Sequence, residues 1–167
     1  MLRFALTTFI GAFLLFQVQP LIGKYILPWY GGGPGVWSTC LLFFQALLVA
    51  GYAYAHGLTR WLNPRAQALT HVVLLAAALA LLPIIPADSW RPRGDESPVE
   101  HILLLLTATV GLPYLLLATT GPLLQAWYSR THGGVAPYRL YALSNTASLL
   151  ALISYPILFE EIGRAHV

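Results

Sequence analysis

Residues 4–27 read FALTTFIGAFLLFQVQPLIGKYIL, and this run of 24 residues establishes the class of fold. An α-helix rises about 1.5 Å per residue, so about 20 apolar residues cross the roughly 30 Å hydrocarbon core of a bilayer. The run exceeds that length, and its single charge, Lys24, lies near its end. It therefore predicts a membrane-spanning helix at the start of the chain.

Four further apolar runs follow, over residues 36–56, 68–85, 101–128 and 138–159. Hydrophobic residues make up 57% of the chain and charged residues 9%, whereas soluble domains carry about 25% charged residues. We therefore predict an all-α fold, a multi-pass transmembrane helical bundle of about five spans. The lipid bilayer is then its main partner.

Prolines interrupt two of the predicted spans. Pro20 removes a backbone donor and strains the carbonyl of Phe16, which predicts a bend or a break in span 4–27. Pro113 and Pro122 interrupt span 101–128 in the same way. That span is either one kinked helix or a helix followed by a short second segment.

Polar side chains occur where hydrocarbon is expected. The first span carries Gln17, Gln19 and Lys24, and a charge at the bilayer centre costs at least about 2.5–3.5 kcal/mol. Gln17 and Lys24 are seven residues apart and therefore share a helix face. Two interpretations follow: a polar pocket at a broken helix, as in transporters, or a lysine that extends its charge to the outer interface.

The other spans carry further polar candidates, which are Gln45, Gln125, Ser144 and Asn145. Each alone suits a hydrogen bond between helices worth about 0.6–2 kcal/mol. Their distribution over several spans favours one shared polar interior. Gly51 and Ala55 form a small-xxx-small pair, which predicts that a neighbouring helix approaches there closely.

Several kinds of chemistry find no support in the sequence. Residues 31–35, GGGPG, follow no strand and lack the spacing of a dinucleotide-binding loop. The histidines show no metal-ligand spacing, and no nucleophile–base arrangement is visible. No basic stretch suits a nucleic acid. We therefore predict no catalytic residue, no metal site and no cofactor in this chain.

The basic residues predict an orientation. One set of span ends carries Arg3, Arg60, Arg65, Arg130 and Arg139, and the other carries Lys24, Arg91 and Arg93. Because lysine and arginine accumulate on the cytoplasmic side, five against three favours a cytoplasmic N-terminus.

Motifs near both ends of the chain carry a resemblance to a known family. They are Phe16–Pro20, Lys24, Leu27–Pro28, Gly31–Gly32, Val36–Trp37, Phe43–Gln45, Gly51–His56, Gly121–Trp127, Pro137–Asn145, Ser148–Leu152 and Tyr155–Pro156. Together they resemble the N-terminal membrane half of bacterial fused membrane/spermidine-synthase-like proteins. The middle of the chain resembles that family only in its general character and carries no matching motif.

The resemblance implies a longer protein in the bacterial inner membrane. Helices likened to a major-facilitator transporter would precede a cytoplasmic Rossmann-like aminopropyltransferase domain, which would use decarboxylated S-adenosylmethionine and a polyamine. Residues 31–35 do not stand in for the nucleotide loop of that domain, so no catalytic residue carries over. More spans are expected before a cytoplasmic domain could follow.

The end of the chain departs from the apolar pattern. Residues 162–167, IGRAHV, look like a translated reading frame of a sequencing adapter, and the alternative is a short polar tail. We expect residues 1–161 to be a transmembrane helical domain, the N-terminal fragment of a longer protein whose C-terminal soluble domain is missing.

Three functions compete on this evidence. The chain is the membrane-anchoring half of a spermidine-synthase-like fusion protein, a transporter-like module for a small polar or cationic solute, or a structural membrane scaffold. A homo-oligomer is compatible with each of these.

Overall fold

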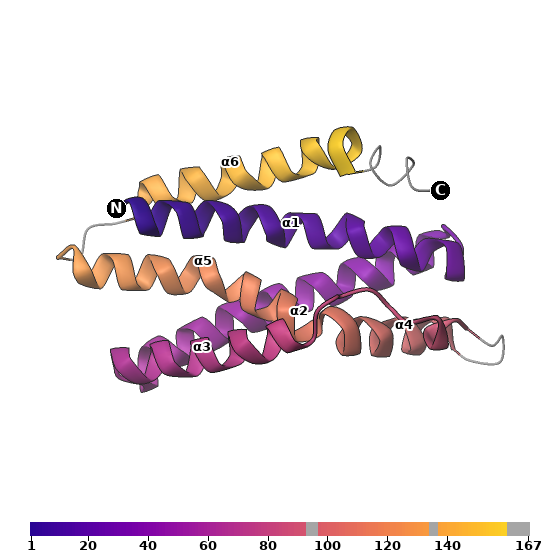
Figure 1. The fold of residues 1–167 in the computed structure, drawn as a ribbon, viewed down its shortest axis with the longest axis horizontal. Helices are drawn as coiled ribbons and strands as arrows, with labels where there is room; N and C mark the ends of the chain where they lie inside the picture. The colour runs from indigo at the N-terminus through magenta and orange to yellow at the C-terminus, as the bar shows by residue number, and fades with distance from the viewer. Residues whose placement is uncertain (93–96, 134–136, 160–167) are drawn as a thin grey trace.

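A computed structural model describes residues 1–92, 97–133 and 137–159. Within these residues every regular element is helical, which confirms the predicted all-α fold (Figure 1). The elements in chain order are α1 (Leu2–Tyr30), α2 (Pro34–Trp61), α3 (Pro64–Ala80), η1 (Asp88–Trp90), α4 (Pro98–Leu106), η2 (Thr107–Gly111), α5 (Leu112–Thr131), α6 (Tyr138–Ser154) and η3 (Tyr155–Phe159). The segment 162–167, predicted to be a foreign tail, lies outside the described residues.

Four helical segments are long and apolar enough to cross a membrane: α1, α2, the run Pro98–Thr131 and the run Tyr138–Ile157. Helix α3 is also apolar but has 17 residues, which at 1.5 Å per residue gives about 26 Å, the lower limit for a crossing. The multi-pass bundle is therefore confirmed, with α3 as its shortest member.

The bounds of α3 differ from the predicted span 68–85. The helix begins at Pro64 because Asn63 caps it, with the Asn63 side chain accepting a hydrogen bond of 2.9 Å from the backbone N–H of Ala66. It ends at Ala80, shortly before Pro83. Proline disfavours the helical conformation of the residue before it, so the helix cannot run on to residue 85.

Successive long segments alternate in direction, so the bundle has two distinct ends (Figure 1). Helix α5 is central: it packs against α1, α2 and α3, while α1 makes its most extensive contact with α6. The buried apolar core lies among α1, α2, α4 and α5, and Ile26, Phe44, Leu105 and Tyr114 are among its members.

The prolines distort the helices less than the sequence suggests. Helix α1 runs through Pro20 without interruption, so the structure excludes a break there. The segment containing Pro113 and Pro122 is one continuous helical run, Pro98–Thr131. It carries a π-helical turn, Thr107–Gly111, just before Pro113. Figure 1 shows that α4 and α5 differ in direction at this turn, so the kinked-helix alternative holds.

The predicted small-xxx-small contact is present. Gly51 and Ala55 of α2 are both buried, and Gly51 faces α5. A Cβ atom at Gly51 would lie 2.8 Å from the Cβ of Ala118 and 3.1 Å from the carbonyl oxygen of Leu115. The Thr119 hydroxyl donates a hydrogen bond of 3.3 Å to the Gly51 carbonyl. Glycine therefore permits the close crossing of α2 and α5.

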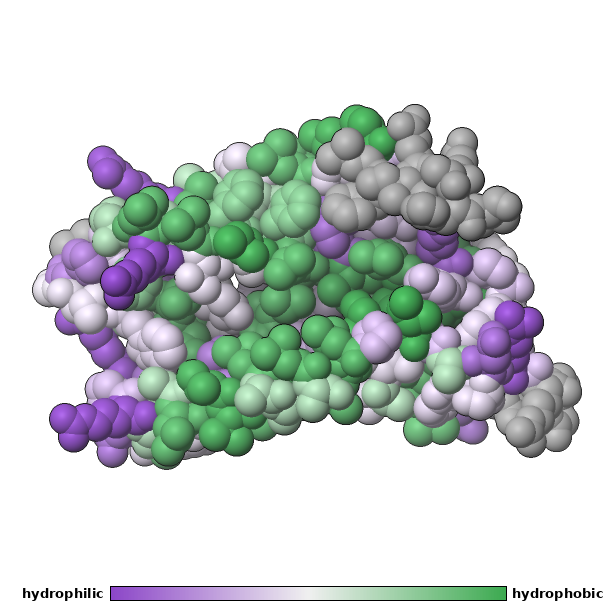
Figure 2. Space-filling model, in the orientation of Figure 1, coloured by the Kyte–Doolittle hydropathy of each residue, from purple (hydrophilic) through white to green (hydrophobic). Residues whose placement is uncertain are grey.

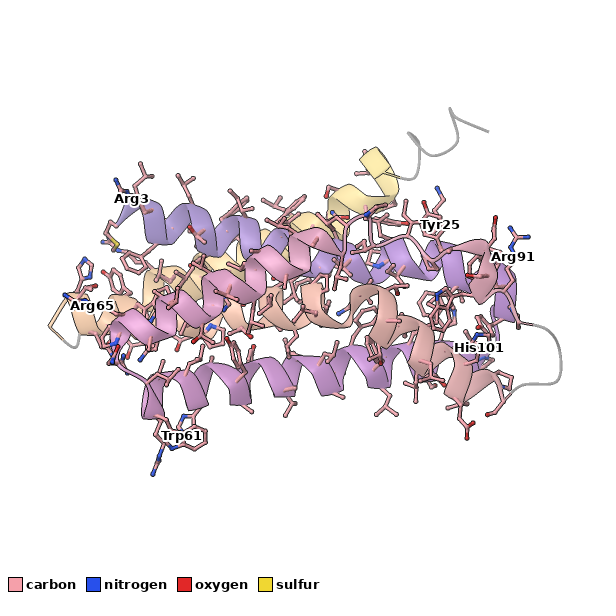
Figure 3. The ribbon with its side chains drawn as sticks, turned by 60° about the horizontal axis from the view of Figure 1, so that its bottom comes forward. Arg3, Tyr25, Trp61, Arg65, Arg91 and His101 are labelled. Atoms are coloured by element: carbon pink, nitrogen blue, oxygen red, sulfur yellow. The ribbon has the colours of Figure 1, made fainter. Side chains whose placement is uncertain are left out.

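The arginines separate by end. One end of the bundle is where α1, α3 and α6 begin and α2 and α5 finish. It carries Arg3, Arg60, Arg65, Arg130 and Arg139. Arg91 lies at the opposite end, as Figure 3 shows, and Arg93 lies outside the described residues. We call the first of these the arginine end.

Candidate functional site

A polar cleft of about 380 Å³ lies between α1, α2, α5 and α6. Its size falls at the lower end of the range for small-molecule sites. Its lining includes six polar side chains, from Thr8, Tyr52, Gln125, Tyr141, Ser144 and Asn145. All four helices contribute at least one of them, so the cleft depends on how these four helices pack together.

The polar groups of the cleft are neutral and incompletely paired. Thr8 is 1% exposed, and its hydroxyl has no hydrogen-bond partner among the described residues. Gln125 and Ser144 are half-buried, whereas Asn145 is exposed. None of the described residues that line the cleft is charged. Because an unpaired charge is costly in a low-dielectric environment, this lining suits a neutral hydrogen-bonding molecule rather than an ion.

Local sequence explains how α6 presents its share of the lining. Ser144 and Asn145 follow Tyr141 by three and four residues, which places both beside Tyr141 on one side of the helix. Asn145 is exposed at the edge of this face and Ser144 is half-buried. Three of the seven intramembrane candidates, Gln125, Ser144 and Asn145, therefore meet in one place.

Gln17 lies at a different junction. Its side chain is 3% exposed, and its Nε2 donates to the Ala151 carbonyl (2.8 Å) and to the Ser154 hydroxyl (3.0 Å). The Tyr155 hydroxyl donates to the Pro20 carbonyl at 3.1 Å. These bonds join α1 to the end of α6.

The remaining candidates are dispersed. The Gln19 amide donates to the Tyr114 hydroxyl at 2.7 Å, which links α1 to α5. Lys24 is exposed, and the structure gives it no hydrogen bond or ion pair with a described residue. Gln45 is exposed on the outer face of α2. The seven polar side chains therefore do not form one shared interior; they divide between a cleft, two helix junctions and the outer surface.

Gln67 was not among the polar candidates from the sequence, although it is fully buried. Its side-chain oxygen accepts from Trp127 Nε1 (2.8 Å) and from Arg130 (3.3 Å), and its Nε2 donates to the Leu62 carbonyl (2.7 Å). Arg130 also donates to the Thr59 carbonyl at 2.7 Å. This network fastens α3 to α5. The predicted span begins one residue later, at Ala68, so Gln67 falls just outside it.

Thr8, Tyr52 and Tyr141 were also not foreseen as cleft residues. Thr8 lies inside an apolar run, and tyrosines near span ends are ordinary interface residues. The only available signal was the spacing of Tyr141 with Ser144 and Asn145 on one helix face.

Neither metal-ligating residues nor similarity to known proteins adds evidence for a function. Among the residues that the structure describes, no three His, Cys, Asp or Glu side chains are placed to hold a metal ion. Comparison with protein-family models, curated proteins and solved structures finds no match for this chain.

Proposed function

We propose that this chain is the membrane-embedded N-terminal half of a spermidine-synthase-like fusion protein. The observation that supports the proposal is that three of the motif blocks carrying the resemblance contact each other. The block Phe16–Pro20 is hydrogen-bonded to Ala151 of the block Ser148–Leu152 and to Tyr155 of the block Tyr155–Pro156, more than 130 residues later in the chain. Because these motifs meet at one junction, we take them as one structural unit and not as separate matches that arise from similar composition.

In this proposal the helices anchor an aminopropyltransferase domain to the bacterial inner membrane. The arginine end faces the cytoplasm, because positive residues are retained on that side. The transfer chemistry belongs to the soluble domain, and the helices fix its location. A homo-oligomer and a purely structural scaffold stay predictions from the sequence.

Sequencing the source genome across codon 161 tests this proposal. We expect an open reading frame that continues through further apolar spans into a Rossmann-type domain with a glycine-rich loop and a following acidic residue. A stop codon directly after residue 161 would overturn the proposal.

A second function is favoured by the polar cleft, namely binding and passage of a small solute. Thr8 is buried without a hydrogen-bond partner in the described chain, and the cleft brings Gln125, Ser144 and Asn145 together beside it. We infer that its solute is neutral and rich in hydrogen-bonding groups, because no described residue of the lining supplies a counter-charge. The cationic alternative therefore has less support than the neutral polar one.

Uptake of radiolabelled neutral amides and polyols by vesicles containing the full-length protein tests the second function. Asn145→Leu should reduce the uptake up to about tenfold, since it removes a cleft amide whose hydrogen bond to the solute is worth about 0.5–1.5 kcal/mol. Gln45→Leu is the matched control, because Gln45 is an exposed amide outside the cleft. Absence of uptake of every solute, or equal loss in both variants, would contradict solute passage through this cleft.

A further inference from the structure

A second depression, of about 460 Å³, lies between α1 and α3 and has α5 as its floor. Its walls are almost wholly apolar: α1 contributes Thr7, Ile10 and Leu14, and α3 contributes Ala68, Val72 and Leu75. Figure 2 shows that this face of the bundle is hollowed and largely hydrophobic. We call this depression the α1–α3 groove. Val72 is 60% exposed, so the groove opens toward the hydrocarbon of the bilayer.

Two arginines continue the walls of the α1–α3 groove to the arginine end. Arg3 precedes Thr7 by four residues and Arg65 precedes Ala68 by three, so each arginine shares a helix face with its wall. Both arginines are exposed and lie at the same end of the bundle (Figure 3).

Neither arginine is neutralised by a carboxylate of the described chain. Within the described residues there is one ion pair, between Arg91 and Asp88, and it lies at the opposite end. Two positive charges without a carboxylate partner among the described residues therefore lie about one helical turn beyond the lining residues Thr7 and Ala68.

We propose that the α1–α3 groove binds an anionic phospholipid of the surrounding bilayer, with one acyl chain between α1 and α3 and the phosphate between Arg3 and Arg65. Arginine pairs with phosphate through parallel N–H···O bonds. Basic pockets between membrane helices on the cytoplasmic side are suited to anionic head groups. The inference shares the cytoplasmic orientation of the arginine end with the proposed function, but it needs neither the anchoring role nor the solute cleft.

The dimensions of the groove favour a lipid over another transmembrane helix. From Thr7 to Leu14 is seven residues, or about 11 Å along α1, whereas a partner helix would follow the full hydrocarbon thickness of roughly 30 Å. An acyl chain fills such a short channel from the interface inward. The two arginines lie where its head group would be.

Binding is measured on the purified full chain in neutral detergent, from the rise of the thermal unfolding midpoint with added phosphatidylglycerol or phosphatidylcholine. We expect phosphatidylglycerol to bind more tightly. The double variant Arg3→Gln/Arg65→Gln should weaken this binding about 30-fold, at about fivefold for each charge. The control Arg60→Gln/Arg139→Gln removes the same charge from the same end, away from the groove, and should leave the affinity within about twofold of the wild type.

A steric pair of variants tests the acyl-chain position. Val72→Trp fills the α1–α3 groove, while Val73→Trp adds the same bulk to an equally exposed neighbour that does not line it. Only Val72→Trp should abolish the preference for phosphatidylglycerol. Equal stabilisation by both lipids, or equal loss in the arginine pair and its control, would overturn the proposal. If Val72→Trp fails to fold, the arginine variants decide alone.

Discussion

Replacing Gly51 by alanine should force α2 and α5 apart. The added Cβ would lie 2.8 Å from the Cβ of Ala118, 3.1 Å from the Leu115 carbonyl oxygen and 3.3 Å from the backbone carbon of Ala118. Carbon atoms in favourable contact are about 3.5–4.0 Å apart, so the helices must separate by up to about 1 Å. Backbone atoms are among the obstacles, and a rotamer change cannot relieve them. We expect a cost of about 1–3 kcal/mol, the usual range for overpacking.

The free energy of unfolding is measured by titrating the purified protein from mild detergent into SDS, followed by circular dichroism. Gly121→Ala is the matched control, because a Cβ there has no neighbour within 4 Å among the described residues. Alanine exceeds glycine in helix propensity, so this variant should be neutral or slightly stabilising. Ala118→Gly in the Gly51→Ala background should restore part of the loss, since it removes the closest contact. If Gly51→Ala is as stable as the wild type, α2 and α5 do not cross at this distance.

Three further variants probe the polar network in the same assay. Gln67→Leu should cost about 1–3 kcal/mol, because it leaves the part-buried Trp127 N–H without its acceptor; a loss below about 0.5 kcal/mol would refute this network. Gln17→Leu removes two interhelical hydrogen bonds worth about 0.6 kcal/mol each, so it should cost about 1 kcal/mol. Unchanged stability would mean that these two bonds do not hold α6 against α1. Lys24→Gln should change stability by less than about 0.5 kcal/mol, because Lys24 is exposed, and a large loss would reveal a partner for its charge.

The class of fold follows from the sequence because hydrocarbon thickness fixes how long an apolar helix must be. The length of the apolar run alone gave the wrong bounds for α3. The helix begins earlier than the run because the Asn63 side chain caps its first turn and Pro64 occupies its first position. The prediction from sequence also overestimated the effect of Pro20. Proline removes one backbone hydrogen bond, and packing of α1 against α5 and α6 keeps the helix continuous around that loss.

The candidate site was harder to predict, because hydropathy does not encode which helices are neighbours. Ser144 and Asn145 were recognised as polar residues within a span, but their meeting with Gln125 depends on α6 packing beside α5 and α1. Gln17 and Lys24 share a helix face in projection, yet one is buried against α6 and the other is exposed. Gln17 bonds to Ala151 and Ser154 in the last turn of α6, whereas Lys24 lies about two turns further along α1, so the same face meets two different environments.

Cysteine accessibility in intact cells tests whether the bundle crosses the membrane five times with the arginine end in the cytoplasm. Cys40 is first replaced by serine, and single cysteines are placed at Leu62 in the α2–α3 turn, Gly32 in the α1–α2 turn and Asp88 before α4. A membrane-impermeant maleimide should label the cysteines at positions 32 and 88 in intact spheroplasts, and the cysteine at position 62 only after the membrane is disrupted. Labelling of positions 62 and 88 from the same side would show that α3 does not cross the membrane. Labelling of position 62 alone in intact spheroplasts would show that the arginine end faces outward, opposite to the predicted orientation.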